Sequence, residues 1–210
     1  MRLLSGANYI GAVKVRGNLV PSAVRVATGR TGLSILCGAC QPPGSLGHIL
    51  KACPRTHGSR NARHDRSVTV VPTAAGKAGW SCIREPAIPT TAGLRRPYLI
   101  YHHQTRSTFV LDVTIVADNA VLHEVHERKV QYYDVPDIRG WIARNISDSL
   151  VQFSSLTLSW RGLMAHESAE TLCSRLGLGR QLLSLLSAVT WERSLWIWQH
   201  FHRSYFALCE

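Results

Sequence analysis

Three cysteines and one histidine lie close together in the first quarter of the chain, with the spacing of a metal site. Cys37 and Cys40 form a Cys-x-x-Cys pair, and His48 and Cys53 follow it. Zinc prefers four tetrahedral sulfur and nitrogen ligands, and a Cys-x-x-Cys turn presents two thiolates to one ion. Intervening glycines and prolines supply the turns that bring the other two ligands round. The spacing predicts a closed, structural Zn²⁺ site, and the alternative is a basic loop with unligated cysteines.

Two charged residues interrupt patterns that are otherwise apolar. Asp112 lies within the nearly continuous apolar run 107–117, and Lys129 lies in the middle of an apolar stripe at helical spacing in residues 120–133. Buried carboxylates are rare without a partner or a metal ion. Each of the two charges therefore needs a functional or structural reason for its position. The alternatives are a structurally paired carboxylate and a lysine whose stem covers apolar surface while its amine reaches water.

Positive charge is concentrated in the first third of the chain. Residues 1–66 contain ten Lys or Arg and one acidic residue, a net charge of +9, whereas residues 67–210 contain fourteen against twelve, a net of +2. This asymmetry predicts a face that binds a polyanion such as nucleic acid. The alternative is a generally basic chain with a solvated surface. The candidate nucleic-acid-binding residues are Arg30, Lys51, Arg55, Arg60, Arg63, His64 and Arg66.

The composition excludes several classes of protein. The chain has 210 residues, of which 45% are hydrophobic and 18% charged, so it is not wholly disordered and has enough apolar residues for a packed core. No stretch approaches the roughly 18 apolar residues of a membrane span, and the first residues are too polar for a signal peptide. We therefore expect a soluble, intracellular protein with no membrane partner.

The order of apolar patterns predicts an α/β (α+β) fold, a mixed sheet with helical cover. The first 30 residues are typical of short helices or extended segments, and residues 33–54 of loops and turns. The predicted strands are 80–88, 97–103, 107–117 and 149–159, and the predicted helices are 59–77, 120–133, 166–176, 179–186 and 189–206. Pro72 is expected to kink or end the first of these helices, because proline lacks the amide hydrogen that a helix interior needs.

Several short motifs follow one another in an order that matches a known family. They are VKVRGNLVPSAVRVATGR, the Cys/His cluster with GHILKACP, then SRNARHD, GW…EP, GLRRP, VLDV and HERKVQYYD. The ordered set resembles the C-terminal region of proteins from non-LTR retrotransposons that insert into ribosomal RNA genes and carry a restriction-like endonuclease. The resemblance extends to about Arg203. It implies a basic linker segment at 1–32, a CCHC zinc knuckle at 33–56 and a PD-(D/E)xK restriction-endonuclease-like domain at 57–206.

The resemblance also implies roles for individual residues. The family has a Pro-Asp at the start of one strand, a second acidic residue 12 to 14 positions later and a lysine on the next helix. Asp112 and Lys129 match the second acid and the lysine. Two carboxylates in such a centre hold Mg²⁺ or Mn²⁺, which activates water and stabilises the transition state, while the lysine helps to position the nucleophile.

The first carboxylate of that centre is missing. The Pro-Asp of the family reads Pro97-Tyr98 here. A phenol is neutral at physiological pH and is a poor ligand for hard cations. Another carboxylate would have to replace it, and Glu85, Glu124 and Glu127 are the candidates.

The sequence therefore supports three functions. The favoured one is a fragment of a non-LTR retrotransposon protein that binds DNA, with RNA as a further ligand, and whose nuclease fold has lost most or all nicking activity. The second is an active metal-dependent endonuclease that nicks target DNA for target-primed reverse transcription. The third is a remnant without a function. A nuclear location is expected for the first two, and no reverse transcriptase signature is present in this chain.

Overall fold

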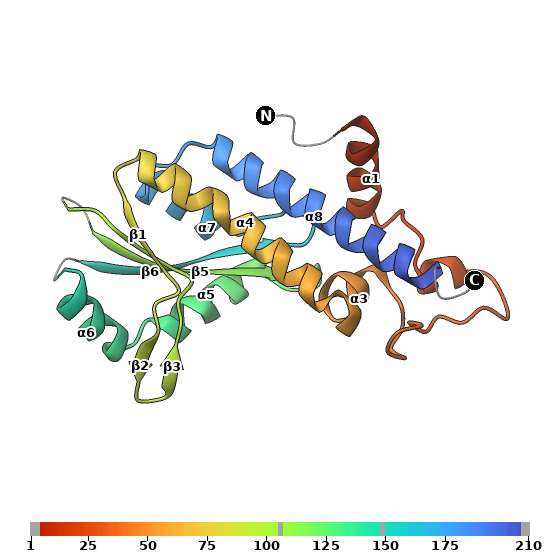
Figure 1. The fold of residues 1–210 in the computed structure, drawn as a ribbon, viewed down its shortest axis with the longest axis horizontal. Coiled ribbons are helices and arrows are strands. Elements are labelled where there is room, and N and C mark those ends of the chain that lie inside the picture. The colour runs from red at the N-terminus through yellow and green to blue at the C-terminus, as the bar shows by residue number, and fades with distance from the viewer. Residues whose placement is uncertain (1–4, 105–106, 148–149, 207–210) are drawn as a thin grey trace.

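A four-stranded mixed sheet with helices on both faces forms the centre of the molecule (Figure 1). The computed structural model describes residues 5–104, 107–147 and 150–206. The helices are α1 (Gly6–Arg16), α2 (Ala23–Ala27), α3 (Leu46–Lys51), α4 (His57–Lys77), α5 (Leu122–Tyr133), α6 (Pro136–Asn145), α7 (His166–Glu170) and α8 (Gln181–Phe206). Pro54–Thr56 forms a 3₁₀ turn, and Thr171–Arg175 a π-helical turn. The strands are β1 (Ser81–Arg84), β2 (Ile88–Thr90), β3 (Gly93–Arg95), β4 (Leu99–His102), β5 (Thr108–Val116) and β6 (Val151–Ser159). The predicted mixed sheet with helical cover is confirmed.

The strand order in the sheet is β1-β4-β5-β6. The pairs β1–β4 and β4–β5 are antiparallel, and β5–β6 is parallel. Seven of the nine residues of β5 are buried, because helices cover both faces of this central strand. That burial on both sides explains its nearly continuous apolar sequence. Strands β2 and β3 form a separate two-stranded hairpin.

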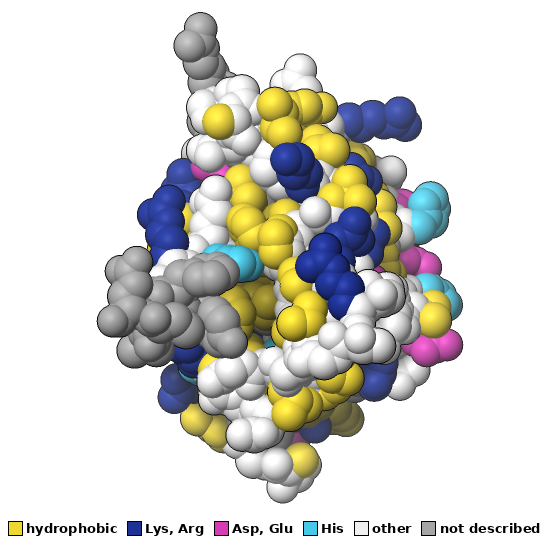
Figure 2. Space-filling model, turned by 90° about the vertical axis from the view of Figure 1, so that its right-hand side faces the viewer, with side chains coloured by type: hydrophobic (Ala, Val, Ile, Leu, Met, Phe, Trp, Pro, Cys, Tyr) yellow, Lys and Arg dark blue, Asp and Glu magenta, His cyan; other side chains and the backbone are white. Residues whose placement is uncertain are grey.

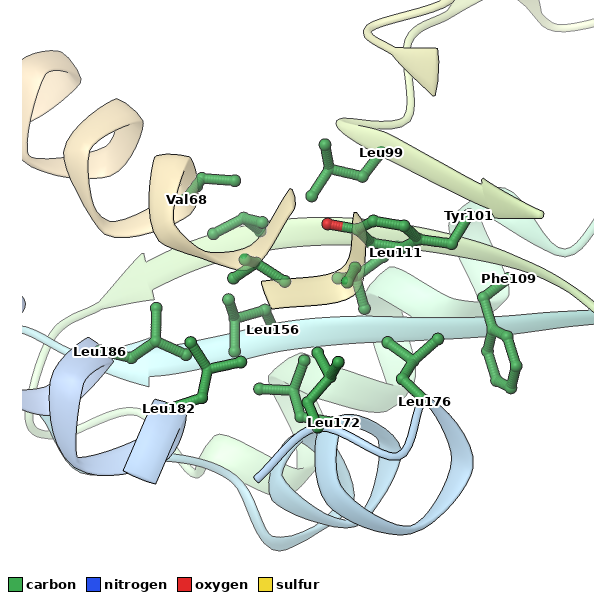
Figure 3. Close-up of a cluster of buried hydrophobic side chains, with 14 of the residues drawn as sticks. Val68, Leu99, Tyr101, Phe109, Leu111, Leu156, Leu172, Leu176, Leu182 and Leu186 are labelled. Atoms are coloured by element: carbon green, nitrogen blue, oxygen red, sulfur yellow. The ribbon is translucent and has the colours of Figure 1, made fainter. Parts of the chain in front are cut away.

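Two groups of buried side chains fill the space between the sheet and its helices. On one face, residues of α4 and the start of α8 pack on Leu99, Leu111 and Leu156 (Figure 3). On the other face, residues of α5 and α6 pack on Ile100 and Val110. Leu99 and Ile100, and likewise Val110 and Leu111, thus point to opposite faces, as successive residues of a strand do.

The outer edge of β6 is covered by the segment that follows it. The Ser168 hydroxyl donates to the Ser155 carbonyl at 2.6 Å and accepts from the Thr157 amide at 3.0 Å. The Ala165 amide donates to the Thr157 carbonyl, and the Ser159 amide to the Leu163 carbonyl. These bonds satisfy backbone groups that an edge strand would otherwise leave unpaired.

Helix α1 packs against α3, β5 and α8. Ala12 and Val15 of α1 lie in one buried cluster with Leu50 of α3, Ile115 of β5 and Leu195 of α8. The described parts of segments 1–32, 33–56 and 57–206 thus all contribute side chains to this cluster, whereas the clusters between the sheet and its helices come from 57–206 alone. The domain boundaries expected at 32 and 56 stay predictions.

The structure differs from the predicted elements in several places. Helix α4 continues through Pro72, because Val68, Val71 and Ala75 on either side of it are buried against the core. The two predicted C-terminal helices are one helix, α8. Helix α3, helix α6 and the β2–β3 hairpin were not predicted. Among the described residues, no helix is both long and apolar enough to span a membrane.

Candidate metal cluster and the Asp112–Lys129 pair

The side chains of Cys37, Cys40, His48 and Cys53 converge on one point. Their ligand atoms all lie within 4.8 Å of one another. The Sγ atoms of Cys37 and Cys53 are 3.9 Å apart, those of Cys40 and Cys53 3.8 Å, and Cys40 Sγ is 3.1 Å from His48 Nε2. Zinc–sulfur bonds of about 2.3 Å in a tetrahedron place two sulfurs about 3.8 Å apart. The cluster could therefore hold a metal ion such as zinc.

Local backbone structure brings these ligands together. The Cys37 amide donates to the Pro42 carbonyl at 2.7 Å, which closes the turn that carries Cys37 and Cys40. Gly44 crosses this turn so closely that a Cβ there would lie 3.2 Å from the Cys37 Cα atom. Ser45 then caps α3 by accepting a bond from the His48 amide, which fixes the first turn of the helix on which His48 lies.

The environment of the ligands sets their protonation in the metal-free chain. Burial, reinforced by the neighbouring thiols, raises the pKa of Cys40 to about 12, and burial also raises the pKa of Cys53. Burial and the positive charge of Arg60 lower the pKa of His48, so its imidazole is neutral, as a metal ligand must be. A bound ion would displace the thiol protons, because thiolates are the ligands.

Asp112 and Lys129 form an ion pair. Asp112 lies on β5 and is 6% exposed, and the Lys129 ammonium on α5 lies 2.8 Å from its Oδ2 atom. Tyr133 lies one helical turn beyond Lys129, and burial together with the negative charge of Asp112 raises the pKa of its phenol. Tyr133 is therefore neutral and donates a hydrogen bond to the Arg96 carbonyl. Sequence reasoning missed Tyr133, although its spacing of four residues from Lys129 places it on the same helix face.

The backbone of Tyr98 lies across the β4–β5 pair from Asp112, but its ring points away from the Asp112–Lys129 pair. The β4–β5 register pairs Leu99 with Leu111, so the next position outward sets Tyr98 opposite Asp112. The Tyr98 ring instead packs edge-on against His64 of α4, with ring centres 4.9 Å apart. Burial, with the negative charges of Asp65 and Glu85, raises its pKa, so the phenol is neutral.

The three candidate replacement carboxylates are exposed on the surface. The Glu85 amide donates to the Tyr98 carbonyl at 2.9 Å, but its side chain is exposed. Glu124 and Glu127 are exposed on α5, and Glu127 lies 3.4 Å from His123. Within the described ranges, the Cys/His cluster is the single group of three or more close metal-ligating side chains, and Asp112 is not part of one.

The basic residues predicted to bind nucleic acid occupy different environments. Arg30, Arg55 and Arg66 are exposed, whereas Lys51 and Arg60 are half-buried. The Lys51 ammonium donates to the Ile115 carbonyl at 2.5 Å, and burial lowers its pKa.

Arg63 is buried and His64 is half-buried, and contacts within the fold hold both side chains. Arg63 is 2% exposed, and its guanidinium donates to the Leu50 carbonyl and the Ser194 hydroxyl, so it joins α4 to α3 and α8 and does not reach solvent. Burial lowers its pKa to about 10, which leaves it charged at neutral pH. The half-buried His64 ring has its Nε2 atom 3.1 Å from the Val113 carbonyl.

An apolar pocket adjoins the metal cluster but not the Asp112–Lys129 pair. It has a volume of about 560 Å³ and lies between α2, α3 and the end of α8. Figure 2 shows this end of the molecule, where hydrophobic side chains surround a hollow and Lys and Arg side chains stand near it. Its lining includes Val26, Leu36, Ile49 and Phe201.

Proteins similar to this chain along most of its length are retrotransposon Pol polyproteins. The chain is 32% identical over 202 residues to the Pol polyprotein of the type-2 retrotransposable element R2DM of Drosophila melanogaster, which covers 95% of the chain and 19% of that protein. It is 34% identical over 161 residues to the R2 Pol polyprotein of Nasonia vitripennis, covering 73% of the chain and 15% of that protein. A Bradysia coprophila R2 polyprotein is 27% identical over 96% of the chain and 23% of its own length. No family model matches the chain. The predicted retrotransposon homology is confirmed, and the chain spans about a fifth of these relatives.

Proposed function

We propose that this chain, whose homologues are R2 retrotransposon Pol polyproteins, is a nucleic-acid-binding region of a site-specific non-LTR retrotransposon protein. In this proposal it carries a zinc knuckle on a restriction-like nuclease scaffold, and the scaffold has lost most or all of its ability to nick DNA. Its partners are DNA and, as a competing ligand, RNA, and it acts in the nucleus. The homology supports the retrotransposon part of the proposal.

The Cys/His cluster supports the zinc knuckle. Cys37, Cys40, His48 and Cys53 would hold Zn²⁺ with no open position for a substrate, so the ion would have a structural role. The cluster lies on a segment that shares its core with α1, β5 and α8. A bound ion would thus stabilise the surface that presents the neighbouring basic residues.

The charge distribution supports nucleic-acid binding. Arg30, Arg55 and Arg66 are exposed in the part of the chain with a net charge of +9. Such residues neutralise phosphates and release counterions, so affinity for nucleic acid should fall steeply as salt is added.

The environment of Asp112 is the observation that carries the loss of nicking. Its close charged partner is Lys129, and Tyr98 occupies the place of the first carboxylate in the family motif. A divalent cation at this place would have one buried carboxylate, whereas Mg²⁺ sites need several oxygen ligands in near-octahedral geometry.

Active nicking is the second candidate, because the Asp112–Lys129 pair matches the remaining part of the family motif. A plasmid-nicking assay with Mg²⁺ or Mn²⁺ separates the two. We expect the wild-type chain to leave supercoiled plasmid intact and Tyr98→Asp to restore some nicking. Nicking by the wild type that Asp112→Asn abolishes would show that the enzyme is active.

Zinc and salt dependence test the binding part of the proposal and the third alternative, a remnant without function. We expect zinc-dependent cooperative unfolding and DNA binding that weakens with salt. A chain without a cooperative transition in zinc would be a remnant, and DNA binding that is independent of salt would contradict the role of the basic surface.

A further inference from the structure

The β2–β3 hairpin stands out from the sheet next to the Asp112–Lys129 pair. It leaves the sheet after β1 and returns to it at β4, and Figure 1 shows it extending away from the four-stranded sheet. The Glu85 amide donates to the Tyr98 carbonyl, which closes the base of the hairpin. Because Tyr98 lies opposite Asp112 in the strand register, the hairpin begins and ends beside the Asp112–Lys129 pair.

Hydrogen bonds hold this hairpin in place at its turn and at its base. At the turn, the Thr91 amide and hydroxyl donate to the Asp137 carboxylate at 2.7 and 3.0 Å. At the base, the Tyr133 phenol donates to the Arg96 carbonyl at 3.1 Å. Ile88 is fully buried against α6, so the inner face of the ribbon is fixed as well. The hairpin is a braced projection rather than a free loop.

The outer face of the ribbon presents an apolar pair to solvent. Pro89 and Leu94 are cross-strand partners, and both are exposed, with Leu94 at 56%. A single exposed leucine is ordinary on a protein surface. Here, however, the leucine and a proline lie side by side on a two-stranded hairpin that is held at its turn and its base. The hairpin can therefore keep its conformation when the pair contacts a ligand.

The charges around the base of the hairpin favour a polyanion as that ligand. Arg84 precedes the hairpin and Arg96 follows it, and both are exposed. Arg95 is occupied, since its guanidinium lies over the Tyr132 ring and donates to the Tyr132 carbonyl. Among the nearby acids, Asp137 is bonded to Thr91, which leaves Glu85 as the exposed carboxylate at the base.

We propose that the β2–β3 hairpin is the element that engages duplex DNA, with Pro89 and Leu94 wedged against a base step and Arg84 and Arg96 on the flanking phosphates. A two-stranded ribbon fits a DNA groove. Leucine and proline side chains serve as wedges that partly unstack base steps, while arginines on phosphates fix the position of the protein. The proposal rests on the proposed nucleic-acid-binding function and adds to it where and how the duplex is held.

Fluorescence of 2-aminopurine tests the wedge, because this base brightens when it is unstacked. The zinc-loaded full chain is titrated into short mixed-sequence duplexes that carry the base at different steps. We expect the wild type to raise the fluorescence and Leu94→Ala to abolish the rise. We also expect Leu94→Ala to lower DNA affinity about tenfold or more, since a leucine would lose its burial. The matched control is Leu163→Ala, another leucine that is 50% exposed but lies far along the chain, after β6.

The arginines have a separate readout. Arg84→Ala and Arg96→Ala should each reduce the slope of log affinity against log salt by about one, as expected for one lost phosphate contact. Unchanged fluorescence and affinity in Leu94→Ala, with salt-dependent binding retained, would overturn the wedge and leave the proposed function standing. Absence of DNA binding by both the wild type and Leu163→Ala would overturn the two proposals together.

Discussion

Lys51 of α3 donates a hydrogen bond to the carbonyl of Ile115, three residues beyond Asp112 on the same strand. The helix that carries His48 is thus bonded directly to the strand that carries Asp112. Arg63 adds a second tie, because its guanidinium donates to the Leu50 carbonyl at 3.0 Å and to the Ser194 hydroxyl at 3.1 Å. Hydrogen bonds therefore connect the Cys/His cluster to the sheet, and we expect substitutions in one to change the stability of the other.

Replacement of Lys51 tests this link. We expect Lys51→Met to lower the free energy of unfolding by about 1 to 2 kcal/mol, since a half-buried, charge-assisted hydrogen bond is lost. Urea unfolding of the zinc-loaded protein measures the change. Lys14→Met, on the exposed side of α1, is the control and should have little effect. Equal stability of the two variants would show that the Lys51–Ile115 bond contributes nothing.

Removal of a ligand from the Cys/His cluster should destabilise the whole molecule. Cys40→Ser is expected to abolish binding of one zinc ion per chain and to lower the melting temperature of the single transition, because the cluster shares a core with α1, β5 and α8. Zinc content and circular dichroism are the measurements. Cys173→Ser, a half-buried cysteine outside the cluster, should retain zinc. Persistence of the wild-type melting curve in Cys40→Ser would contradict a structural role for the ion.

Removal of Lys129 alone should lower the free energy of unfolding more than replacement of both Asp112 and Lys129. Lys129→Met leaves a carboxylate that is 6% exposed without its cation, and we expect a loss of about 1 to 3 kcal/mol, reduced from the fully buried case because the Lys129 side chain is 37% exposed. The double variant Asp112→Asn with Lys129→Met should recover part of that loss. A double-mutant cycle by urea unfolding measures the coupling, and strictly additive effects would mean that the two charges do not interact.

A histidine at the α5–α7 contact should make stability depend on pH. A hydrogen bond to Glu167, with the charge of Glu127, raises the pKa of His123. A raised histidine pKa adds stability that is fully present below the unfolded value of about 6.5 and is lost as pH rises through the folded value. Burial lowers the pKa of His126 and has the opposite sign, so the comparison needs a variant.

The His123→Gln variant isolates this contribution. Melting temperatures of the two proteins should differ most at acidic pH, near pH 5, and converge toward about pH 8. A constant difference across that range would exclude an ionised His123–Glu167 pair.

Pro72 offers a stabilising substitution. Within the continuous helix α4 it lacks the amide that would donate to the Val68 carbonyl, which costs about 3 kcal/mol or more in a free helix. Pro72→Ala should therefore raise the free energy of unfolding by about 1 kcal/mol or more, as measured by the urea midpoint. A decrease would mean that packing of the proline ring outweighs the missing bond.

Periodicity and ligand spacing predicted the parts of the molecule that obey local rules. Strand β5 and helix α5 are where the apolar patterns placed them, and the Cys/His spacing predicted a cluster whose ligand atoms converge. Pro72 does not end helix α4, because tertiary packing on both sides of it outweighs its local cost. Helix α6 was missed, although Pro136 at its first position is a recognised start signal.

Other features depended on three-dimensional information. Nothing in the sequence around Arg63 distinguishes it from the exposed Arg66, because burial of Arg63 depends on Leu50 and Ser194, which lie in other segments. The sequence around Tyr98 likewise does not indicate that its ring packs against His64. Long-range contacts of single side chains thus set orientations that the sequence pattern does not show.

The hydroxyl of Ser168 has a consequence for assembly. It hydrogen-bonds to the Ser155 carbonyl and the Thr157 amide, so another molecule cannot add a strand at the β6 edge of the sheet. Within the described part of the chain, no strand pairs with the far side of β1, whose residues are mostly exposed. β-Augmentation of this fold, by a neighbouring segment of a longer polyprotein or by an aggregating copy, is therefore directed to β1.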